Sequence, residues 1–226
     1  MNKRAFFITG TDTSAGKTVV AAALIRFWQQ DGARVAGLKP IASGFELRGG
    51  SYKNDDVEMI KAASNVVLSD DVINRYAYRP AVAPHIVAQQ NKDKIELHKI
   101  VQDAEEALTK VDTLVVEGVG GWLVPLNGYD QDYQDIKLLA ESLNYPVIMV
   151  VAMRLGCISH ALLTAQSIMA SGAPFAGWVA NFSDPDFECR EQNLAILDER
   201  LPVPRLFDMP YAGCPKKETE IINIRS

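Results

Sequence analysis

The residues whose types and spacing point most directly to chemistry lie at positions 10–18, which read GTDTSAGKT. They follow an apolar run and precede a helical pattern, and this order of strand, glycine-bearing turn and helix is typical of a phosphate-binding loop. Backbone N–H groups at the helix start would point at the anion, and Gly16 would let the backbone approach it closely. Lys17 would place a positive charge on the outer phosphates, and the Thr18 hydroxyl suits the accompanying magnesium. Gly10 lies one residue further from Gly16 than is usual, so the loop alone predicts nucleotide binding and no particular reaction.

A second candidate cation, Lys39, ends the next apolar segment of the chain. Burying an unpaired ammonium is unfavourable, so a lysine here either uses its charge in a site or extends its tip to solvent. Because this segment follows the phosphate loop in sequence, we interpret Lys39 as a second positive charge at the same site. Ser43, four residues further on, is a candidate hydrogen-bonding group for a small polar ligand.

Acidic residues stand at two further points. Glu117 ends an apolar run and is followed by glycines at 118, 120 and 121, a pattern that packing alone does not explain. A carboxylate at this place in a nucleotide-hydrolysing fold is a second magnesium ligand. Asp55 and Asp56 precede a helical pattern, where acidic residues also serve as ordinary N-terminal caps. Since magnesium takes only one or two carboxylates beside phosphate and water, we expect Thr18, Asp56 and Glu117 as ligands. Asp55 is the alternative to Asp56.

Three other strand ends carry polar groups or free backbone donors. Residues 154–160, RLGCISH, follow an apolar strand and open a helix, whose first N–H groups suit an anion such as a substrate carboxylate. The amide of Asn181 could read the edge of a base through its paired donor and acceptor, although an ordinary strand-end turn explains it equally well. Pro210 and Tyr211 lie beyond the last strand. The histidines at 85, 98 and 160 form no pattern typical of nucleophilic catalysis.

The elements that would position these residues alternate between apolar strands and helical patterns. We predict strands at 4–9, 34–39, 113–117, 147–152, 175–181 and 203–207. We predict helices at 17–30, 55–63, 95–109, 133–143, 159–171 and 187–200, and a long active-site loop at 43–54. Near-continuous apolar strands suit a parallel sheet covered on both faces, so the pattern predicts a doubly wound α/β fold in one domain, residues 1–226. Ligands in such folds sit at the carboxyl ends of the strands.

The composition limits the function classes. The chain has 226 residues, 48% of them hydrophobic, with 23 basic and 28 acidic residues and a net charge of −5. The absence of a basic block argues against a nucleic-acid partner, and no stretch is long enough for a membrane span or a signal peptide. The three cysteines are far apart and have no metal-binding spacing, so we expect reduced thiols and a cytoplasmic protein.

Taken together and in order, several segments resemble the dethiobiotin synthetase family. They are TGTDT and GKT within 9–18, GLKPIASG at 37–44, NDD at 54–56, EGVGGW at 117–122, LGCI and HA within 155–161, and GWVAN at 177–181. The resemblance runs from residue 4 to about residue 212. A phosphate loop alone is common, whereas the KPxASG and EGxGGW segments in this order are specific.

The resemblance implies a P-loop NTPase-like fold and a ligase that uses ATP and Mg²⁺. It implies that 7,8-diaminononanoate and CO₂ or bicarbonate give dethiobiotin, ADP and phosphate through a carbamate. Lys17 and Lys39 would neutralise the phosphoryl group and the carbamate, while Thr13 and Ser43 would hydrogen-bond their oxygens; these four are the implied catalytic residues. Magnesium would bind Thr18, Asp56 and Glu117. ATP would contact the phosphate loop, the acidic strand ends and the base-side residues: Thr13, Ser14, Ala15, Gly16, Lys17, Thr18, Val19, Asp56, Glu117, Gly118, Val119, Gly120, Asn181, Pro210 and Tyr211.

The resemblance further implies a homodimer. The diamine would contact Lys39 and Ser43 in one subunit, and its tail carboxylate would reach the turn formed by Leu155, Gly156, Cys157 and Ile158 across the interface. Three residues depart from the usual family pattern: Ser14 replaces a common glutamate, Arg154 replaces a common lysine, and Phe182 replaces an acidic residue.

Two alternative functions remain at this point. One is another P-loop amide-forming synthetase, such as the amidases of cobalamin assembly, which typically carry an added glutaminase domain. The other is a nucleotide-switched dimeric ATPase of the chromosome-partitioning type, which usually has an additional lysine where this chain has Thr11 and Asp12.

Overall fold

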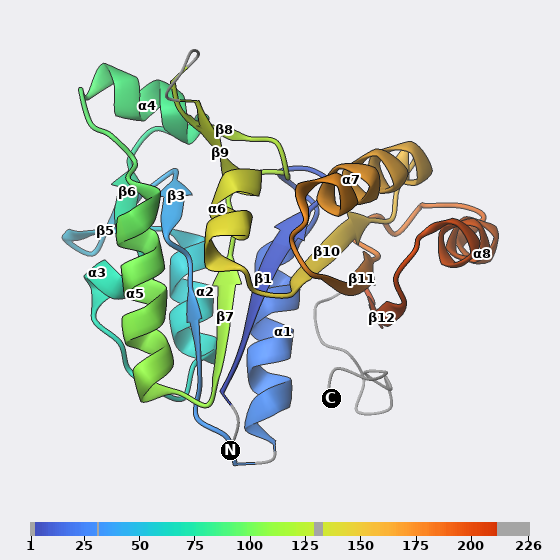
Figure 1. The fold of residues 1–226 in the computed structure, drawn as a ribbon, viewed down its shortest axis with the longest axis horizontal. Coiled ribbons are helices and arrows are strands. Elements are labelled where there is room, and N and C mark those ends of the chain that lie inside the picture. Colours follow the sequence, from blue (N-terminus) through green and yellow to red (C-terminus); the bar gives the residue numbers. More distant parts are fainter. Residues whose placement is uncertain (1–2, 31, 129–132, 212–226) are drawn as a thin grey trace.

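A parallel six-stranded sheet forms the centre of the molecule, in a computed structural model that describes residues 3–30, 32–128 and 133–211. The strands are β1 (Arg4–Gly10), β2 (Val35–Leu38), β7 (Thr113–Glu117), β10 (Val147–Ala152), β11 (Phe175–Asn181) and β12 (Arg205–Met209). Their order across the sheet is β12-β11-β10-β1-β7-β2, and every neighbouring pair is parallel (Figure 1). The carboxyl ends of all six strands therefore lie at one edge of the sheet, which is where α/β folds bind their ligands.

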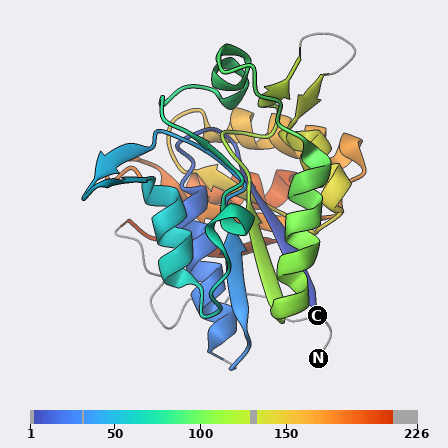
Figure 2. The ribbon, with the colours of Figure 1, turned by 90° about the vertical axis from the view of Figure 1, so that its left-hand side faces the viewer.

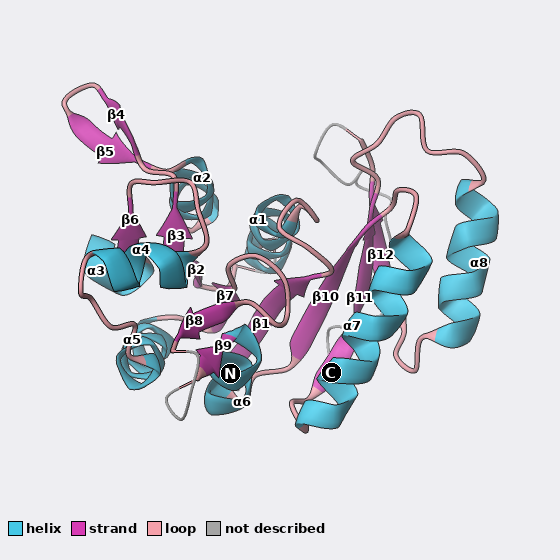
Figure 3. Ribbon diagram, turned by 90° about the horizontal axis from the view of Figure 1, so that it is seen from above, coloured by secondary structure: helices cyan, strands magenta, loops and turns pink. Residues whose placement is uncertain are grey.

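Helices cover both faces of this sheet, as the view from above shows (Figure 3). One apolar cluster joins the sheet to α1 (Lys17–Gln29), against which α2 (Asp55–Ala63) packs. The other joins the opposite face to α5 (Leu97–Lys110), α6 (Ile136–Leu143) and α7 (Cys157–Ser171), with α8 (Arg190–Arg200) beside α7. Every residue of β7 and β10 is buried, and β10 and the centre of β7 are apolar, because both of their faces are covered.

Several shorter helices and strands lie outside the central sheet, near the carboxyl ends of its strands. Helices α3 (Asp70–Ile73) and α4 (Pro84–Gln90) accompany a short parallel pair, β3 (Ile41–Ser43) with β6 (Tyr76–Tyr78). The antiparallel hairpin of β4 (Glu46–Arg48) and β5 (Ser51–Lys53) projects from the body (Figure 2), and β8 (Pro125–Asn127) pairs with β9 (Gln134–Asp135). No helix in the described part of the chain is both long enough and apolar enough to cross a membrane.

The predicted α/β fold with a largely parallel sheet is confirmed. The strands predicted at 113–117, 147–152 and 175–181 and the helix predicted at 55–63 have those bounds, and the other predicted helices and strands shift at their ends by one to three residues. The long loop expected at 43–54 is wrong at its centre, where the β4–β5 hairpin forms. The helix expected from 133 begins at Ile136 because the Asp135 side chain accepts the Leu138 N–H as its cap.

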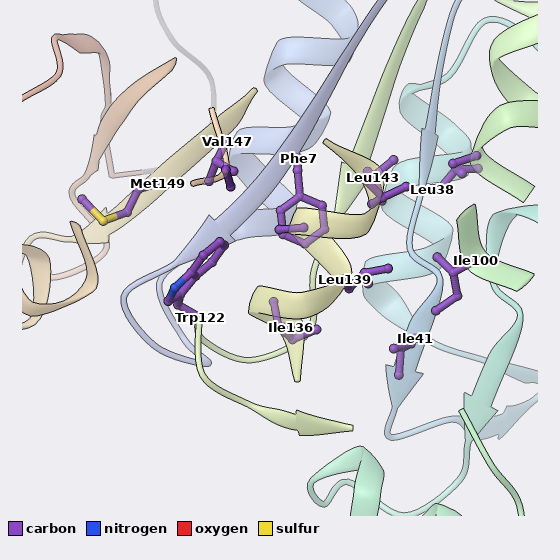
Figure 4. Close-up of a cluster of buried hydrophobic side chains, with 14 of the residues drawn as sticks. Phe7, Leu38, Ile41, Ile100, Trp122, Ile136, Leu139, Leu143, Val147 and Met149 are labelled. Carbon is purple, nitrogen blue, oxygen red and sulfur yellow. The ribbon is translucent and has the colours of Figure 1, made fainter. Parts of the chain in front are cut away.

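The apolar core also fixes the loop that follows β7. Trp122 is 3% exposed and lies in the same cluster as Phe7 and Ile136 (Figure 4). A Cβ placed on Gly118 would lie 3.0 Å from the Phe7 ring and 3.4 Å from Ile136, so the loop runs directly over the core. The core therefore holds the residues just beyond Glu117 in place.

Candidate active site

The phosphate loop joins β1 to α1 as the sequence predicts. Gly16, at the N-cap of α1, has a φ of 85°, in the left-handed region that favours glycine. A Cβ at this position would lie 2.0 Å from Nδ2 of Asn181, the last residue of β11. The Asn181 amide donates a hydrogen bond of 2.8 Å to the Ala15 carbonyl. Asn181 thus supports the loop from the end of β11, two strands away from β1 in the sheet.

Lys17 is buried at the start of α1 and is held by the loop itself. Its Nζ donates to the carbonyl oxygens of Asp12 at 3.1 Å and Thr13 at 3.4 Å. Burial, followed by the positive charge of Lys39, lowers the pKa of Lys17 to about 8, against the opposing effect of nearby carboxylates. Two neutral carbonyls satisfy the ammonium without neutralising it, so the lysine is suited to receive an anion.

Lys39 lies directly after β2 and is buried among carboxylates. Its Nζ donates to Glu117 Oε1 and to the Gly118 carbonyl at 3.1 Å, and lies 3.3 Å from Asp56 Oδ2. Burial lowers the pKa of Lys39, but Glu117 and Asp56 together outweigh burial and raise it above its ordinary value. Unlike Lys17, Lys39 is therefore held firmly in its charged form.

The oxygen atoms around Lys39 form a set that a hard cation would accept. The Thr18 hydroxyl donates to Glu117 Oε1 at 2.8 Å, and Glu117 Oε2 is buried with no hydrogen-bond partner among the described residues. In that part of the chain, no group of three His, Cys, Asp or Glu side chains is arranged as a metal site by itself. Magnesium nevertheless needs only one or two carboxylates when phosphate and water complete its shell, so Thr18, Asp56 and Glu117 fit it.

The two aspartates at the start of α2 have different surroundings. Asn54 caps the helix by accepting hydrogen bonds from the N–H groups of Asp56 and Val57. Asp55 turns outward and forms an ion pair with Arg48 of the β4–β5 hairpin, whereas Asp56 faces Lys39. The geometry thus brings Asp56 to the candidate metal site, and Asp55 serves the helix start and the hairpin.

These groups line one cavity with a volume of about 640 Å³. Its polar side carries the phosphate-loop, Lys39 and acidic side chains, and its other wall is apolar. The Ser43 hydroxyl is buried at this cavity without a hydrogen-bond partner among the described residues. Of the predicted site residues, the cavity brings together Thr13, Ser14, Gly16, Lys17, Thr18, Val19, Lys39, Ser43, Asp56, Glu117, Val119 and Gly120. Such a space, charged at one side and apolar at the other, suits a small molecule with an alkyl part beside a nucleotide.

Comparison with known proteins decides the family. A family model described as an AAA domain matches residues 4–215. The chain is 44% identical to the ATP-dependent dethiobiotin synthetase of Nitrosospira multiformis over 208 residues, which cover 92% of this chain and 88% of the relative. The relative of the same name in Cellvibrio japonicus is 42% identical over 210 residues, covering 93% and 90% of the two chains. The chain belongs to the dethiobiotin synthetase family.

More distant structures resemble this family member in fold. The signal recognition particle receptor FtsY of Elizabethkingia anophelis, in complex with GDP, has a TM-score of 0.55 at 12% identity. That match covers 92% of this chain and 57% of the receptor. FtsY of Mycoplasma mycoides has a TM-score of 0.54 at 14% identity, and the match covers 92% of this chain and 60% of that protein. The resemblance to both is one of fold.

Several residues expected from the family pattern lie outside the cavity. Leu155 and Gly156 form the turn before α7, with Leu155 95% exposed and Gly156 at a φ of 94°. Cys157 and Ile158 begin that helix, and burial raises the pKa of the Cys157 thiol. Pro210 and Tyr211 are exposed beyond β12. Ala15, Gly118 and Asn181 do not line the cavity, and Asn181 contacts the loop backbone.

Sequence reasoning missed the apolar wall of the cavity. It is formed by Ala81, Val82, Ala83 and Pro84, which run into α4, together with Ala42, Met59 and Val124. Small apolar residues in a connecting segment carry no chemical signal of their own. Only the proline at the first position of α4, a common helix start, could have marked where this wall ends.

Proposed function

We propose that this chain closes the ureido ring of dethiobiotin, using 7,8-diaminononanoate, CO₂ and ATP and releasing ADP and phosphate. The names of its relatives support ATP dependence and the product. The observation that carries the proposal for this chain is Lys39, a second buried ammonium at the same cavity as Lys17. A loop that only binds nucleotide needs Lys17 alone, whereas a reaction between two anions needs a further positive charge.

Three bond changes make up the proposed reaction. One amine of the substrate attacks CO₂ and loses a proton, which gives a carbamate. A carbamate oxygen then attacks the γ-phosphorus of ATP, the bond from that phosphorus to ADP breaks, and a carbamic–phosphoric anhydride forms. The second amine attacks the carbonyl carbon, loses a proton, and phosphate leaves with its bridging oxygen.

The chain's own contribution to these steps is positioning and charge. Lys17 would contact the outer phosphates, and Lys39 would hold the carbamate against the γ-phosphate, which lowers the repulsion between the two anions. Ser43, whose buried hydroxyl has no partner in the described structure, and Thr13 would hydrogen-bond carbamate or phosphoryl oxygens. The apolar wall at 81–84 would exclude water from the anhydride.

We place magnesium at Thr18, Asp56 and Glu117. When bound, the ion would supply positive charge to the phosphate oxygens. Glu117 Oε2, which has no hydrogen-bond partner in the part of the chain that the structure describes, supports this placement, because a buried carboxylate oxygen without a partner is costly.

The base of the nucleotide would lie near Asn181, Pro210 and Tyr211. The Asn181 Nδ2 is already bonded to the Ala15 carbonyl, so its Oδ1 remains to accept a hydrogen bond from an exocyclic amine. The substrate's tail carboxylate would bind backbone N–H groups at the 155–158 turn of a second subunit in a homodimer.

Phosphate release tests the proposal. Magnesium and ATP are incubated with the protein, with and without the diamine and bicarbonate, and both phosphate and dethiobiotin are measured. We expect release that requires the diamine and matches the product mole for mole. Turnover that ignores the diamine would instead favour a nucleotide-switched ATPase and would contradict the proposal.

A further inference from the structure

An ion pair joins the phosphate loop to the neighbouring strand end. Arg154 follows β10 by two residues, and its Nη2 donates to Asp12 Oδ2 in the middle of the loop. The two residues are 142 positions apart in sequence and meet because β1 and β10 are adjacent and parallel. The side chains are 44% and 24% exposed, so this pair lies at the rim of the site rather than in the core.

Asp12 also holds the catalytic lysine, but through its backbone. Its carbonyl oxygen accepts the 3.1 Å hydrogen bond from Lys17 Nζ, while its carboxylate is bound by Arg154. The residue before it is tied to the same strand, because the Thr11 N–H donates to the Val150 carbonyl at 3.0 Å. Asp12 therefore connects the two sets of contacts: its backbone binds Lys17, and its side chain binds the residue that follows β10.

Arg154 is itself built into the turn that opens α7. Its carbonyl accepts the Cys157 N–H at 2.9 Å, and its N–H donates to the Ala152 carbonyl at 2.9 Å. Two hydrogen bonds thus fix the Arg154 backbone at the strand end, and the guanidinium extends from this position to Asp12. Without that guanidinium, the Asp12 carboxylate would lose its hydrogen-bonded cation in a loop that is to bind phosphates.

We propose that Arg154 is a positioning residue for ATP, acting through Asp12. It keeps the Asp12 carbonyl beneath the Lys17 ammonium and neutralises the one carboxylate within the phosphate loop. The inference rests on the proposed function for its turnover measurement but not for its binding measurement. Arg154 contacts neither ATP nor the diamine in this proposal.

The test uses Arg154→Gln, Arg154→Lys, Asp12→Asn and the double variant Asp12→Asn/Arg154→Gln. We expect Arg154→Gln to weaken binding of a nonhydrolysable ATP analogue with magnesium by about tenfold, in the range of coupling between contacting residues. The KM for ATP should rise by the same factor, with kcat changed less than threefold. Arg154→Lys should restore most of the affinity. The double variant should bind the ATP analogue no more weakly than the weaker-binding of the two single variants, because either single substitution already breaks the contact between Asp12 and Arg154.

A matched control separates positioning from general stability. Arg34→Gln breaks a comparable exposed ion pair, with Asp112, at the other end of the sheet and should leave affinity and KM unchanged. Melting temperatures of all variants show that each is folded at the assay temperature. Affinity of Arg154→Gln within twofold of the parent, or losses that multiply in the double variant, would overturn the inference. A parent chain without diamine-dependent turnover would overturn the proposed function, and the binding measurement would still decide the role of Arg154.

Discussion

The two buried lysines illustrate how neighbours decide what one residue type can do. Lys17 is bound by backbone carbonyls, and its pKa falls to about 8, while Lys39 is bound by carboxylates and its pKa rises. A charge that its neighbours have not neutralised attracts an incoming phosphate strongly. A charge fixed between carboxylates instead stays in place, where it can orient a second anion.

Replacing Lys39 should separate nucleotide binding from ring closure. We expect Lys39→Ala to bind ATP but to lose at least a hundredfold in the rate of dethiobiotin formation, since a missing electrostatic contact to the reacting groups costs about that much. Binding is measured by calorimetry with a nonhydrolysable analogue, and synthesis by product formation. Lys61→Ala, on the outer side of α2 where Lys61 pairs with Asp70, is the control and should retain both properties. An unchanged synthesis rate in Lys39→Ala would refute the role assigned to this residue.

Lys17 should make the protein less stable than a neutral residue would at the same place. Its native pKa of about 8 lies below the ordinary 10.5, so the unfolded chain binds more protons between these values and stability rises with pH across that window. Below pH 8 the full cost applies, on the order of 3 kcal/mol. We therefore expect Lys17→Met to unfold at higher urea concentration than the parent at pH 7, with the difference shrinking towards pH 10.5.

The exposed Lys110 provides the comparison for this prediction. Lys110→Met should change the free energy of unfolding by less than about 0.5 kcal/mol at either pH. A Lys17→Met variant no more stable than the parent at pH 7 would show that burial of the ammonium is not the dominant effect.

At the scale of elements, the strands that are buried in the central sheet can be predicted from the sequence. The short strands that form only by pairing with a distant segment cannot. β7 and β10 were predictable because every residue in them is buried and their centres are apolar, and the sheet edge they define placed Glu117 near the phosphate loop. β3 and β6 were not, because three-residue strands separated by more than thirty positions pair only once the fold brings them together. The β4–β5 hairpin is wholly exposed and leaves no apolar pattern.

The same distinction applies to the candidate site. Charged residues at strand ends could be recognised because their charge is costly in a buried strand, as for Lys39 and Glu117. The wall at 81–84 and the Asp12–Arg154 pair could not, because nothing in small apolar residues or surface charges specifies a partner far away in sequence.

Asn54 connects two of these elements and offers a test at this scale. Its side-chain Oδ1 accepts the Asp56 and Val57 N–H groups and so caps α2, and its Nδ2 donates to the Ser43 carbonyl of β3 at 3.0 Å. Asn54→Ala should lower the free energy of unfolding by about 1–2 kcal/mol, since both contacts are lost. Asn54→Asp should keep the cap yet raise the KM for the diamine, because Ser43 loses its tether. Urea unfolding and steady-state kinetics measure the two effects.

Ser69 is the natural control, as it stands at the N-cap of α3 without a side-chain cap hydrogen bond. Ser69→Ala should leave both stability and KM near the parent values. If Asn54→Ala matched Ser69→Ala in stability, the cap at α2 would contribute nothing measurable.

At the scale of the whole molecule, the outer face of α7 is the surface that the proposed dimer would use. Leu155, Leu163 and Met169 are 95%, 63% and 57% exposed along this helix and its preceding turn. Large apolar side chains gathered on one element are typical of an interface rather than of free surface. An interface here would bring the 155–158 turn of each subunit towards the other.

Charging this face should separate the subunits. We expect the parent to sediment as a dimer and Leu163→Glu as a monomer at the same concentration, and we expect the variant to raise the KM for the diamine at least tenfold while changing ATP affinity little. Ile196→Glu on α8, a residue 40% exposed, is the control. A dimer that persists in Leu163→Glu would place the interface elsewhere.

The contact between Gly16 and Asn181 has a consequence for changing nucleotide preference by design. The asparagine that would read the base also donates to the Ala15 carbonyl, and it fills the space that a Cβ at residue 16 would need. A substitution such as Asn181→Asp, made to invert base selectivity, would also place a carboxylate oxygen next to the Ala15 carbonyl oxygen. The two oxygens would repel each other and displace the phosphate-binding loop. Base selectivity and phosphate affinity therefore depend on the same residue in this chain. A variant with a new nucleotide preference needs compensating changes in the loop.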